Sequence, residues 1–552
     1  MKKIVFAISL LVVLTGCDKF LDLTPRDSIS DKVMWATTES AEYAVNDIYS
    51  YVYNIYASWP SSVGMTEAFT DEFKYGSYVN FAMCLIPSQV AYGGTNLTNS
   101  FVSVYLGCWS SLYSAIRRTN EALSNLHSLG TGLPEDVQVR LEGELRLMRG
   151  WLYFELVKRY KEVILYDEDL TQIAVEKALS SEADAWQMIG ADLAFAAENL
   201  PVKAAAKGRL DKGCALALTT RAMLYAGEYD KVIDAADELE ALGYALMPDY
   251  AKAFTASVTE GNTETILQYT FSYADGVTHE FDFYYAPGGD YKLVGQQGGG
   301  YGTPTQEMVE SYEKADGSGF PDWSPWHGET TAQPPYAQLE PRFQATILYN
   351  GAAWKDRKIE PFIGGTDGWC QWNKEPKPEG RTTTGYYLKK FVDETHDLSA
   401  RSQSTQHFVI LRYGEVLLNK AEACYRSGDT DGANAAVKAI RARVGLPYTN
   451  KSGDDLWKAI RQERRVELAF EGLWYWDLRR WKEAAEDYPL GLNNYQVHGL
   501  KIESTAVAGQ YKYSYVSVDD QDRNFPSKMY RFPIPDGELN SNPLVNQYPE
   551  WN

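Results

Sequence analysis

The chain has 552 residues, long enough for about two to four domains on length alone. Hydrophobic residues make up 45% and charged residues 23%, the ordinary composition of a globular protein. The net charge is −21, and removal of Lys2 and Lys3 with the signal described next takes it to −23. This charge argues against nucleic acid or an anionic lipid surface as the main partner.

The N-terminus is a secretion signal that ends in a lipid attachment site. A basic start precedes an apolar run at 4–14, which is too short for a bilayer-spanning helix of ~20 residues. Residues 14–17 read Leu-Thr-Gly-Cys, a lipobox in which the thiol of Cys17 takes the lipid. The alternative is an ordinary signal peptide with a chance cysteine. We expect removal of 1–16 and a mature chain 17–552 tethered through Cys17.

The remaining cysteines predict neither a zinc site nor a redox motif. They are five in number, an odd count, and no two of them form a CxxC pair. Single buried thiols are expected, and one disulfide stays open. These residues are Cys84, Cys108, Cys214, Cys370 and Cys424.

Helical patterning dominates residues 30–245 and returns at 408–485. Two segments, 208–243 and 413–445, resemble each other. Each contains a helix, a turn at a small residue and glycine, and a second helix rich in alanine. This is typical of the tetratricopeptide kind of helical hairpin, with a generic hairpin as the alternative.

Residues 246–407 have a different character, because Gly, Pro, Trp and Tyr cluster there and break regular elements. Aromatic richness argues against disorder. We therefore expect an ordered, loop-rich face with a few short strands laid over a helical scaffold, which is where binding sites usually lie. An irregular segment, 486–552, is expected to close the chain.

No common catalytic signature is present: the chain has no HExxH, GxSxG or Walker A motif, and its six histidines have no ligand spacing. The most charged motif, 461–472, places Glu463, Glu467 and Glu471 four residues apart on one predicted helix face. Interleaved arginines indicate an ion-pair network there and not a pair of glycosidase carboxylates across a cleft.

This motif also carries a resemblance to a known family. Residues 463–472, together with 475–481 and the ending at 530–543, resemble the C-terminal signature of the SusD/RagB family. Further matches run in order over nearly the whole mature chain. They are the leader at 17–25, Asp71-Glu72, 208–213, 304–308, 341–343 and 383–387.

The resemblance implies a mainly α fold, with tetratricopeptide-like hairpins as scaffold and a loop-rich ligand face. It also implies an outer-membrane lipoprotein of Bacteroidetes, exposed at the cell surface. Members of this family are not enzymes. They bind a nutrient, usually an oligosaccharide, and act as the lid of a SusC-like TonB-dependent transporter. No cofactor is expected, and whether a calcium ion orders a loop stays open.

In glycan-binding members of the family the ligand site is an aromatic arc built by loops, and it transfers here by region only. An aromatic face stacks on a sugar ring while polar side chains at the rim bond its hydroxyls. Trp323 and Trp326 are the leading candidates because Gly and Pro surround them. The other aromatic candidates are Tyr75, Tyr78, Tyr92, Tyr285 and Tyr291, and the polar candidates are Asn80, Asp290 and Asp322.

Three other functions compete with glycan capture. The same architecture can bind a peptide, which the acidic charge would suit if the peptide is basic. A surface glycoside hydrolase lacks a carboxylate pair that any motif supports. A tetratricopeptide scaffold for protein partners leaves the long aromatic region without a role.

Overall fold

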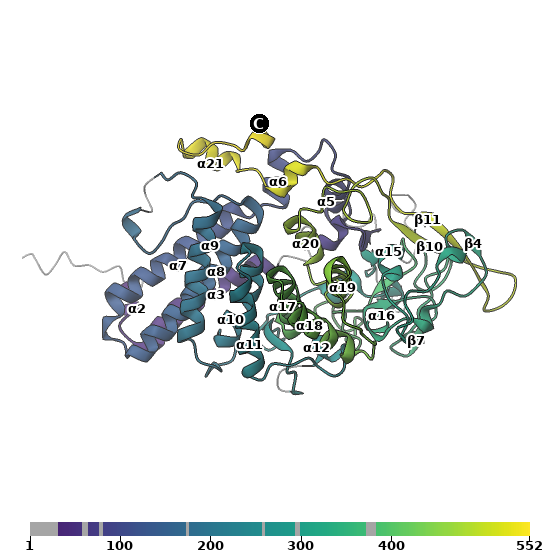
Figure 1. Ribbon diagram of the computed structural model, residues 1–552, viewed down its shortest axis with the longest axis horizontal. Coiled ribbons are helices and arrows are strands. Elements are labelled where there is room, and N and C mark those ends of the chain that lie inside the picture. Colours follow the sequence, from purple (N-terminus) through teal and green to yellow (C-terminus); the bar gives the residue numbers. More distant parts are fainter. Residues whose placement is uncertain are drawn as a thin grey trace, which may run out of the picture.

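The computed structural model of the protein describes residues 31–57, 65–76, 81–172, 176–256, 260–292, 298–370 and 382–552. The predicted signal at 1–16 and the candidates Cys17, Tyr78 and Asn80 lie outside these residues. The described chain is mainly helical, with several small sheets of two or three strands, which confirms the predicted fold class. Figure 1 shows long helices gathered at one end and short elements with loops at the other.

The long helices form one continuous array that two separate parts of the sequence build. Its first part comprises α3 (Thr38–Ala57), α7 (Trp109–Leu129), α8 (Glu135–Tyr160), α9 (Glu182–Asn199), α10 (Lys212–Ala226) and α11 (Tyr229–Ala241). Its second part comprises α17 (Tyr413–Ser427), α18 (Thr430–Arg443) and α19 (Gly453–Glu467). Helix α11 packs on α17, so the two predicted hairpins, far apart in sequence, lie side by side (Figure 1).

Both hairpins turn at a glycine in the left-handed region. Gly227 ends α10 with φ 78°, and Gly428 ends α17 with φ 84°. Only glycine adopts this conformation without steric cost, and it lets the following amides cap the last carbonyls of the helix. The predicted tetratricopeptide-like hairpins are confirmed.

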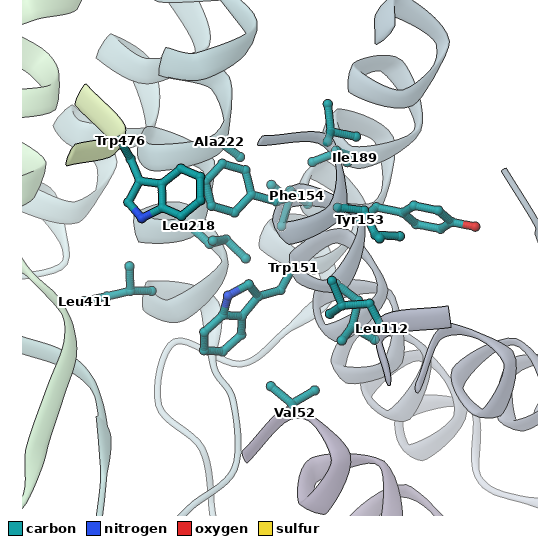
Figure 2. Packing of buried hydrophobic residues seen from close by; sticks show 14 of the residues in the cluster. Val52, Leu112, Trp151, Tyr153, Phe154, Ile189, Leu218, Ala222, Leu411 and Trp476 are labelled. Atoms are coloured by element: carbon teal, nitrogen blue, oxygen red, sulfur yellow. The ribbon is translucent and has the colours of Figure 1, made fainter. Parts of the chain in front are cut away.

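The core of the helical half is centred on α8. Its Trp151 and Phe154 meet Leu218 of α10 and Trp476 of α20 (Trp474–Arg480) in one buried cluster, as Figure 2 shows. α8 is buried on most of its circumference, because α7, α9 and α10 all pack against it. The cluster therefore joins the first part of the array to the C-terminal signature motif.

The loop-rich half has a core of its own, made largely of aromatic rings. Around it lie the short helices α12 (Lys252–Thr255), α13 (Phe281–Tyr285), α14 (Gly288–Lys292), α15 (Gln306–Glu310) and α16 (Pro341–Thr346). The two-stranded pairs are β1 (Phe73–Tyr75) with β3 (Gly302–Pro304), β2 (Thr265–Tyr269) with β9 (Phe408–Arg412), β5 (Ile347–Leu348) with β8 (Tyr387–Leu388), and β6 (Ala353–Trp354) with β7 (Arg357–Lys358). Core packing accounts for much of the aromatic content.

The charged motif forms a buried ion network, but with partners other than the expected ones. Glu467 pairs with Arg342, Arg412 and Arg443, which come from α16, β9 and α18. Glu463 shares Arg342, whose Nη1 lies 2.7 Å from its Oε2. The neighbouring arginines of the motif bind carboxylates elsewhere, since Arg461, Arg464 and Arg465 pair with Glu483, Asp477 and Asp71.

The expectation that Glu471 shares the helix face of Glu463 and Glu467 is wrong. Helix α19 ends at Glu467, and Phe470 and Gly472 have positive φ values of 62° and 74°, which a helix cannot contain. Glu471 instead pairs with Arg412 and Lys390 on the far side of the turn.

The segment expected to be irregular, 486–552, contains the longest strands among the described residues. Strand β10 (His498–Ser504) pairs antiparallel with β11 (Tyr511–Ser517) over seven residues, and β4 (Glu329–Thr330) adds an edge to β11. The segment also contains the short helix α21 (Asp536–Ser541), which lies beside the helical array (Figure 1). The signal that would have predicted this hairpin is the alternation of tyrosines at every second position, which is the period of a strand.

Candidate functional site

The three-stranded sheet carries a row of aromatic residues on one face. Strand residues alternate between faces, so Tyr513 and Tyr515 point to the same side as Leu500 and Ile502 of the neighbouring strand. Leu500, Ile502 and Tyr513 are fully buried and form a small separate core. Tyr515, at the end of this row, is half-exposed.

Four residues make an aromatic surface at this end of the sheet, which we call the sheet patch: Trp326, His327, His498 and Tyr515. The rings of His498 and Tyr515 stack with centroids 4.2 Å apart and an interplanar angle of 13°. His327 approaches the same tyrosine at 4.8 Å. The His327 side chain is 44% exposed and that of His498 is 26% exposed, so the rings face solvent.

Two carboxylates of α15 hold the histidines of the sheet patch. His498 Nδ1 lies 2.7 Å from Glu307 Oε1, and His327 Nε2 lies 2.8 Å from Glu310 Oε1. Burial raises the pKa of Glu307, although its hydrogen bonds to His498 oppose this. Thr305 caps α15 by accepting a hydrogen bond from Met308 N, so the Pro304-Thr305 segment positions both carboxylates.

The two leading candidates differ in exposure. Trp326 is half-exposed, and its Nε1 donates to Ala332 O at 3.0 Å, which anchors the ring at the surface. Trp323 is only 5% exposed and packs edge-on beneath Trp326, with centroids 5.8 Å apart. Trp323 therefore supports the surface and does not present a face to a ligand. Asp322 is exposed, and its Oδ1 accepts from Ser324 N to start the turn before Trp326.

A second aromatic group, the aromatic rim, comprises Phe283, Tyr284, Tyr291 and Tyr301. Phe283 and Tyr284 are half-exposed, and their rings contact Tyr291 and Tyr301 at 5.4 Å and 5.3 Å. Tyr291 is 1% exposed, and its hydroxyl has no hydrogen-bond partner among the described residues. The predicted Tyr291 thus forms the buried base of the rim, beneath the ring of Phe283.

Tyr75 and Tyr285 are core residues, which corrects their expected place on the ligand face. Their side chains are 1% and 0% exposed, and their hydroxyls lie 2.5 Å apart. Tyr75 also accepts a hydrogen bond from Met65 N at 2.7 Å. A ring with no exposed face cannot stack on a sugar, so these two residues fix β1 to α13 instead.

The polar candidate Asp290 is also a structural residue. Its carboxylate accepts from Trp354 Nε1 at 3.0 Å, Arg357 Nη2 at 2.6 Å and Lys355 Nζ at 3.0 Å. With 8% exposure and these three donors, it has little capacity left for ligand hydroxyls. Burial alone would lower the pKa of Arg357, but Asp367 and Asp290 together raise it.

Tyr92 is half-buried beside a charged cluster beneath α5 (Phe81–Tyr92). Lys74 Nζ donates to its hydroxyl at 3.1 Å and lies 2.6 Å from Asp519 Oδ1. Burial raises the pKa of Tyr92, and the negative charge of Asp519 adds to the effect. The structure therefore gives Tyr92 a polar partner on its inner side and leaves part of the ring exposed.

Comparison with known proteins identifies the family. A family model described as SusD family matches residues 263–551, more than half of the chain. The chain belongs to the SusD family. A second model, described as starch-binding and associating with the outer membrane, matches residues 19–224, and a prokaryotic lipoprotein lipid attachment site matches residues 1–17.

Relatives and solved structures agree with the SusD assignment. A SusD-like protein of Bacteroides ovatus is 23% identical, covering 99% of this chain and 97% of that one. The crystal structure of a SusD-like protein from Bacteroides fragilis is 26% identical with a TM-score of 0.77, covering 95% and 99% of the two chains. A second from the same species, described as a SusD-like carbohydrate binding protein, has a TM-score of 0.74 at 23% identity and covers 93% and 100%.

These matches settle the class and location of this SusD protein. It is a lipid-anchored outer-membrane protein, and the family to which it belongs consists of non-catalytic binding proteins. No helix in the described ranges is both long and apolar enough to span a membrane. Nor do those ranges hold a cluster of three or more His, Cys, Asp or Glu side chains suited to a metal ion.

Proposed function

We propose that this SusD protein captures an oligosaccharide on the sheet patch and delivers it to a SusC-like TonB-dependent transporter, for which it acts as the lid. The observation that carries the proposal is the sheet patch itself, in which exposed and half-exposed rings lie beside carboxylates. Lipid on Cys17 tethers the protein at the membrane that holds such a transporter. No bond is broken in this process.

The chemistry of the sheet patch suits a sugar ring. The apolar face of Trp326 offers a flat surface on which a pyranose stacks, and the stacked rings of His498 and Tyr515 add a partly exposed aromatic edge to the same patch. Glu310 is 24% exposed, and its carboxylate accepts hydrogen bonds from hydroxyl groups. Because Trp326 packs on Trp323 and Tyr515 packs on His498, both rings are already held in place and little side-chain entropy is lost on binding.

Similar solved structures support a carbohydrate ligand. One, of 22% identity and TM-score 0.59, is described as a laminarin-binding SusD-like protein, and another as carbohydrate binding. The aromatic rim, through the half-exposed rings of Phe283 and Tyr284 that rest on the predicted Tyr291 and on Tyr301, is the second surface that we propose to contribute to the ligand face. Half-exposed Tyr92 and the predicted Tyr78 and Asn80 remain further proposals for this face.

The test is mobility retardation in native gels that contain a panel of polysaccharides. A glycan that retards the wild-type protein should bind Trp326→Ala and Tyr515→Ala at least tenfold more weakly. Trp457→Ala is the matched control, since Trp457 is also half-exposed but lies on α19. Equal retardation of all variants would remove the sheet patch from the proposal. No retardation by any glycan, with measurable binding of basic peptides, would favour the peptide ligand.

Delivery to the transporter has a separate test. The lipidated protein, purified from native outer membranes in mild detergent, should bring down a TonB-dependent transporter in a fixed ratio. A Cys17→Ser variant, which cannot take lipid, is expected to lose outer-membrane retention and with it most of the complex. Recovery of the wild-type protein without any such partner would contradict the proposed role as a lid.

A further inference from the structure

A small cavity rich in positive charge lies between α8, α10 and α20. Four of its lining side chains are cationic: Lys158, Lys161, Arg479 and Arg480. The rings of Trp476 and Tyr225 form its apolar wall. A cluster of four cations is unexpected in a chain whose net charge is −21.

Arg479 is the unusual member of this cavity. It is 4% exposed, and its Nη2 donates to Met529 O at 2.9 Å and to Tyr530 O at 3.1 Å. Its Nε and Nη1 have no hydrogen-bond partner in the described part of the chain. The guanidinium instead stacks against Trp476 and Phe532, with its Cζ 4.5 Å and 4.7 Å from their ring centroids. A buried guanidinium with unsatisfied donors is costly.

The other cations at the cavity already have carboxylate partners. Lys158 pairs with Glu155 at 2.8 Å, and Lys161 pairs with Glu182 at 3.1 Å. Arg480 binds Glu422 and Asp477.

Two of those carboxylates are also shared with cations outside the cavity. Glu155 also binds Arg159, and Asp477 also binds Arg464. Lys482, which lies over the ring of Tyr530, adds another positive charge nearby. The carboxylates are therefore committed, and none neutralises Arg479.

The pKa values of these groups reflect the excess of positive charge at the cavity. Burial lowers the pKa of Arg479 to about 10; Tyr475 opposes this shift in part, and the positive charge of Arg159 adds to it. The pKa of Lys158 is lowered to about 8, again chiefly by burial. The pKa of Lys482 is lowered by burial and then by Lys161. An anion in the cavity would relieve this repulsion.

We propose that this cavity binds one small monovalent anion of about the size of chloride, held by Nε and Nη1 of Arg479 with Lys158 and Lys161 around it. The cavity has a free volume of about 10 Å³, which admits one such ion and not a whole sulfate or sugar. The bound anion links the C-terminal end of α8 to Arg479 of α20, and Arg479 Nη2 in turn donates to the carbonyls of Met529 and Tyr530. It is independent of the ligand face.

Bromide provides a direct test, because it replaces chloride and scatters anomalously. Crystals of the mature protein grown with sodium bromide should show an anomalous peak in the cavity, within hydrogen-bonding distance of Arg479. Peaks only at the outer surface, with none in the cavity, would overturn the proposal.

A second test uses thermal stability at constant sodium concentration, with gluconate replaced stepwise by chloride. At 100 times its dissociation constant, chloride should raise the Tm by about 2 °C for a chain of this length. General salt effects would lower the Tm in this exchange, because gluconate is more strongly excluded from the protein surface than chloride and therefore stabilises the folded state more.

Lys161→Gln should lose most of this chloride response. Lys420→Gln is the matched control, because it also removes a lysine that forms an ion pair but lies outside the cavity. The Lys420 side chain is 20% exposed and that of Lys161 is 24% exposed. An equal response in wild type and Lys161→Gln would contradict the site, as would a lack of any response in the wild-type protein.

Discussion

At the scale of single residues, burial divides side chains of one kind into different roles. Trp323 and Trp326 are three positions apart, yet one is 5% exposed and the other half-exposed. Tyr285 lies in the core, whereas its neighbour Tyr284 is half-exposed. Composition and neighbouring Gly or Pro residues do not distinguish these cases, because exposure depends on distant segments such as β1, whose Tyr75 packs on Tyr285.

The tryptophan pair gives a prediction about stability. Trp323→Ala should destabilise the protein by about 3–5 kcal/mol, because it leaves a cavity beside Tyr336 in the aromatic core. Trp326→Ala should cost about 1–2 kcal/mol, since its ring is only half-buried. Equilibrium urea unfolding of both variants measures the difference. Equal losses would mean that the two rings are equally buried in solution.

The buried carboxyl of Glu67 predicts an unusual pH dependence. Burial raises the pKa of Glu67 from 4.5 to about 7, although Gly472 N donates to it. The folded state thus binds a proton that the unfolded state has lost, so this group lowers stability progressively as the pH rises from about 4.5 to 7. Above pH 7 the full loss is about 3 kcal/mol.

Glu67→Gln removes that loss and should raise the Tm at pH 8 but not at pH 4.5. The expected gain disappears as the pH falls, because the wild-type carboxyl is then protonated in both states. Scanning calorimetry at several pH values measures the gain. Glu198→Gln on the exposed face of α9 is the control and should change little at any pH. A gain that does not vary with pH would contradict the argument.

At the scale of elements, the helical hairpins follow from local chemistry. A helix that ends in a small residue and glycine can be recognised from a short stretch of sequence alone. Both hairpins that were predicted in this way are present in the structure. The β10–β11 hairpin was missed, although Tyr511, Tyr513 and Tyr515 alternate over the required period. Its loop, 505–510, has no strong turn dipeptide, and its short partner β4 comes from a segment nearly two hundred positions earlier.

The glycine turns can be tested by substitution. Gly428→Ala should destabilise the protein by about 1–2 kcal/mol through backbone strain alone, because φ is 84° and an added Cβ would meet no atom within 4 Å. Gly537→Ala in α21 is the control: it has equally open surroundings and no positive φ, so it should be neutral or slightly stabilising. Thermal unfolding measures both. A neutral Gly428→Ala would mean that the turn relaxes to another conformation.

At the scale of the whole molecule, long-range contacts decide what the sequence leaves open. The family motif at 463–472 predicted an ion network, but its partners come from α16, β9 and α18, which no local spacing indicates. The same holds for the sheet patch, where His327 and His498 meet across Tyr515 only after three separate segments have folded together. Motifs therefore identify the family and its scaffold, whereas the residues of the ligand face depend on tertiary packing.

The ion network predicts how the two halves depend on each other. Burial alone would raise the pKa of Glu467, but Arg443, Arg412 and Arg342 outweigh it and hold the pKa well below its ordinary value. A lowered pKa means that the carboxylate stabilises the folded state at neutral pH and that this stabilisation is lost as the pH falls. Glu467→Gln leaves three buried guanidinium groups short of one negative charge.

We expect Glu467→Gln to destabilise the protein by about 3–5 kcal/mol, the usual cost of removing one partner from a buried ion pair. Asp455→Asn is the control. Asp455 and its partner Lys458 have side chains that are 77% and 75% exposed, so this ion pair should contribute less than about 0.5 kcal/mol to stability. Urea unfolding followed by tryptophan fluorescence measures both. Because Arg342 and Arg412 belong to the loop-rich half and Arg443 to the helical array, loss of Glu467 should also make the two halves unfold at more widely separated urea concentrations than in the wild-type protein. A single transition with unchanged midpoint would show that the network is not what joins the halves.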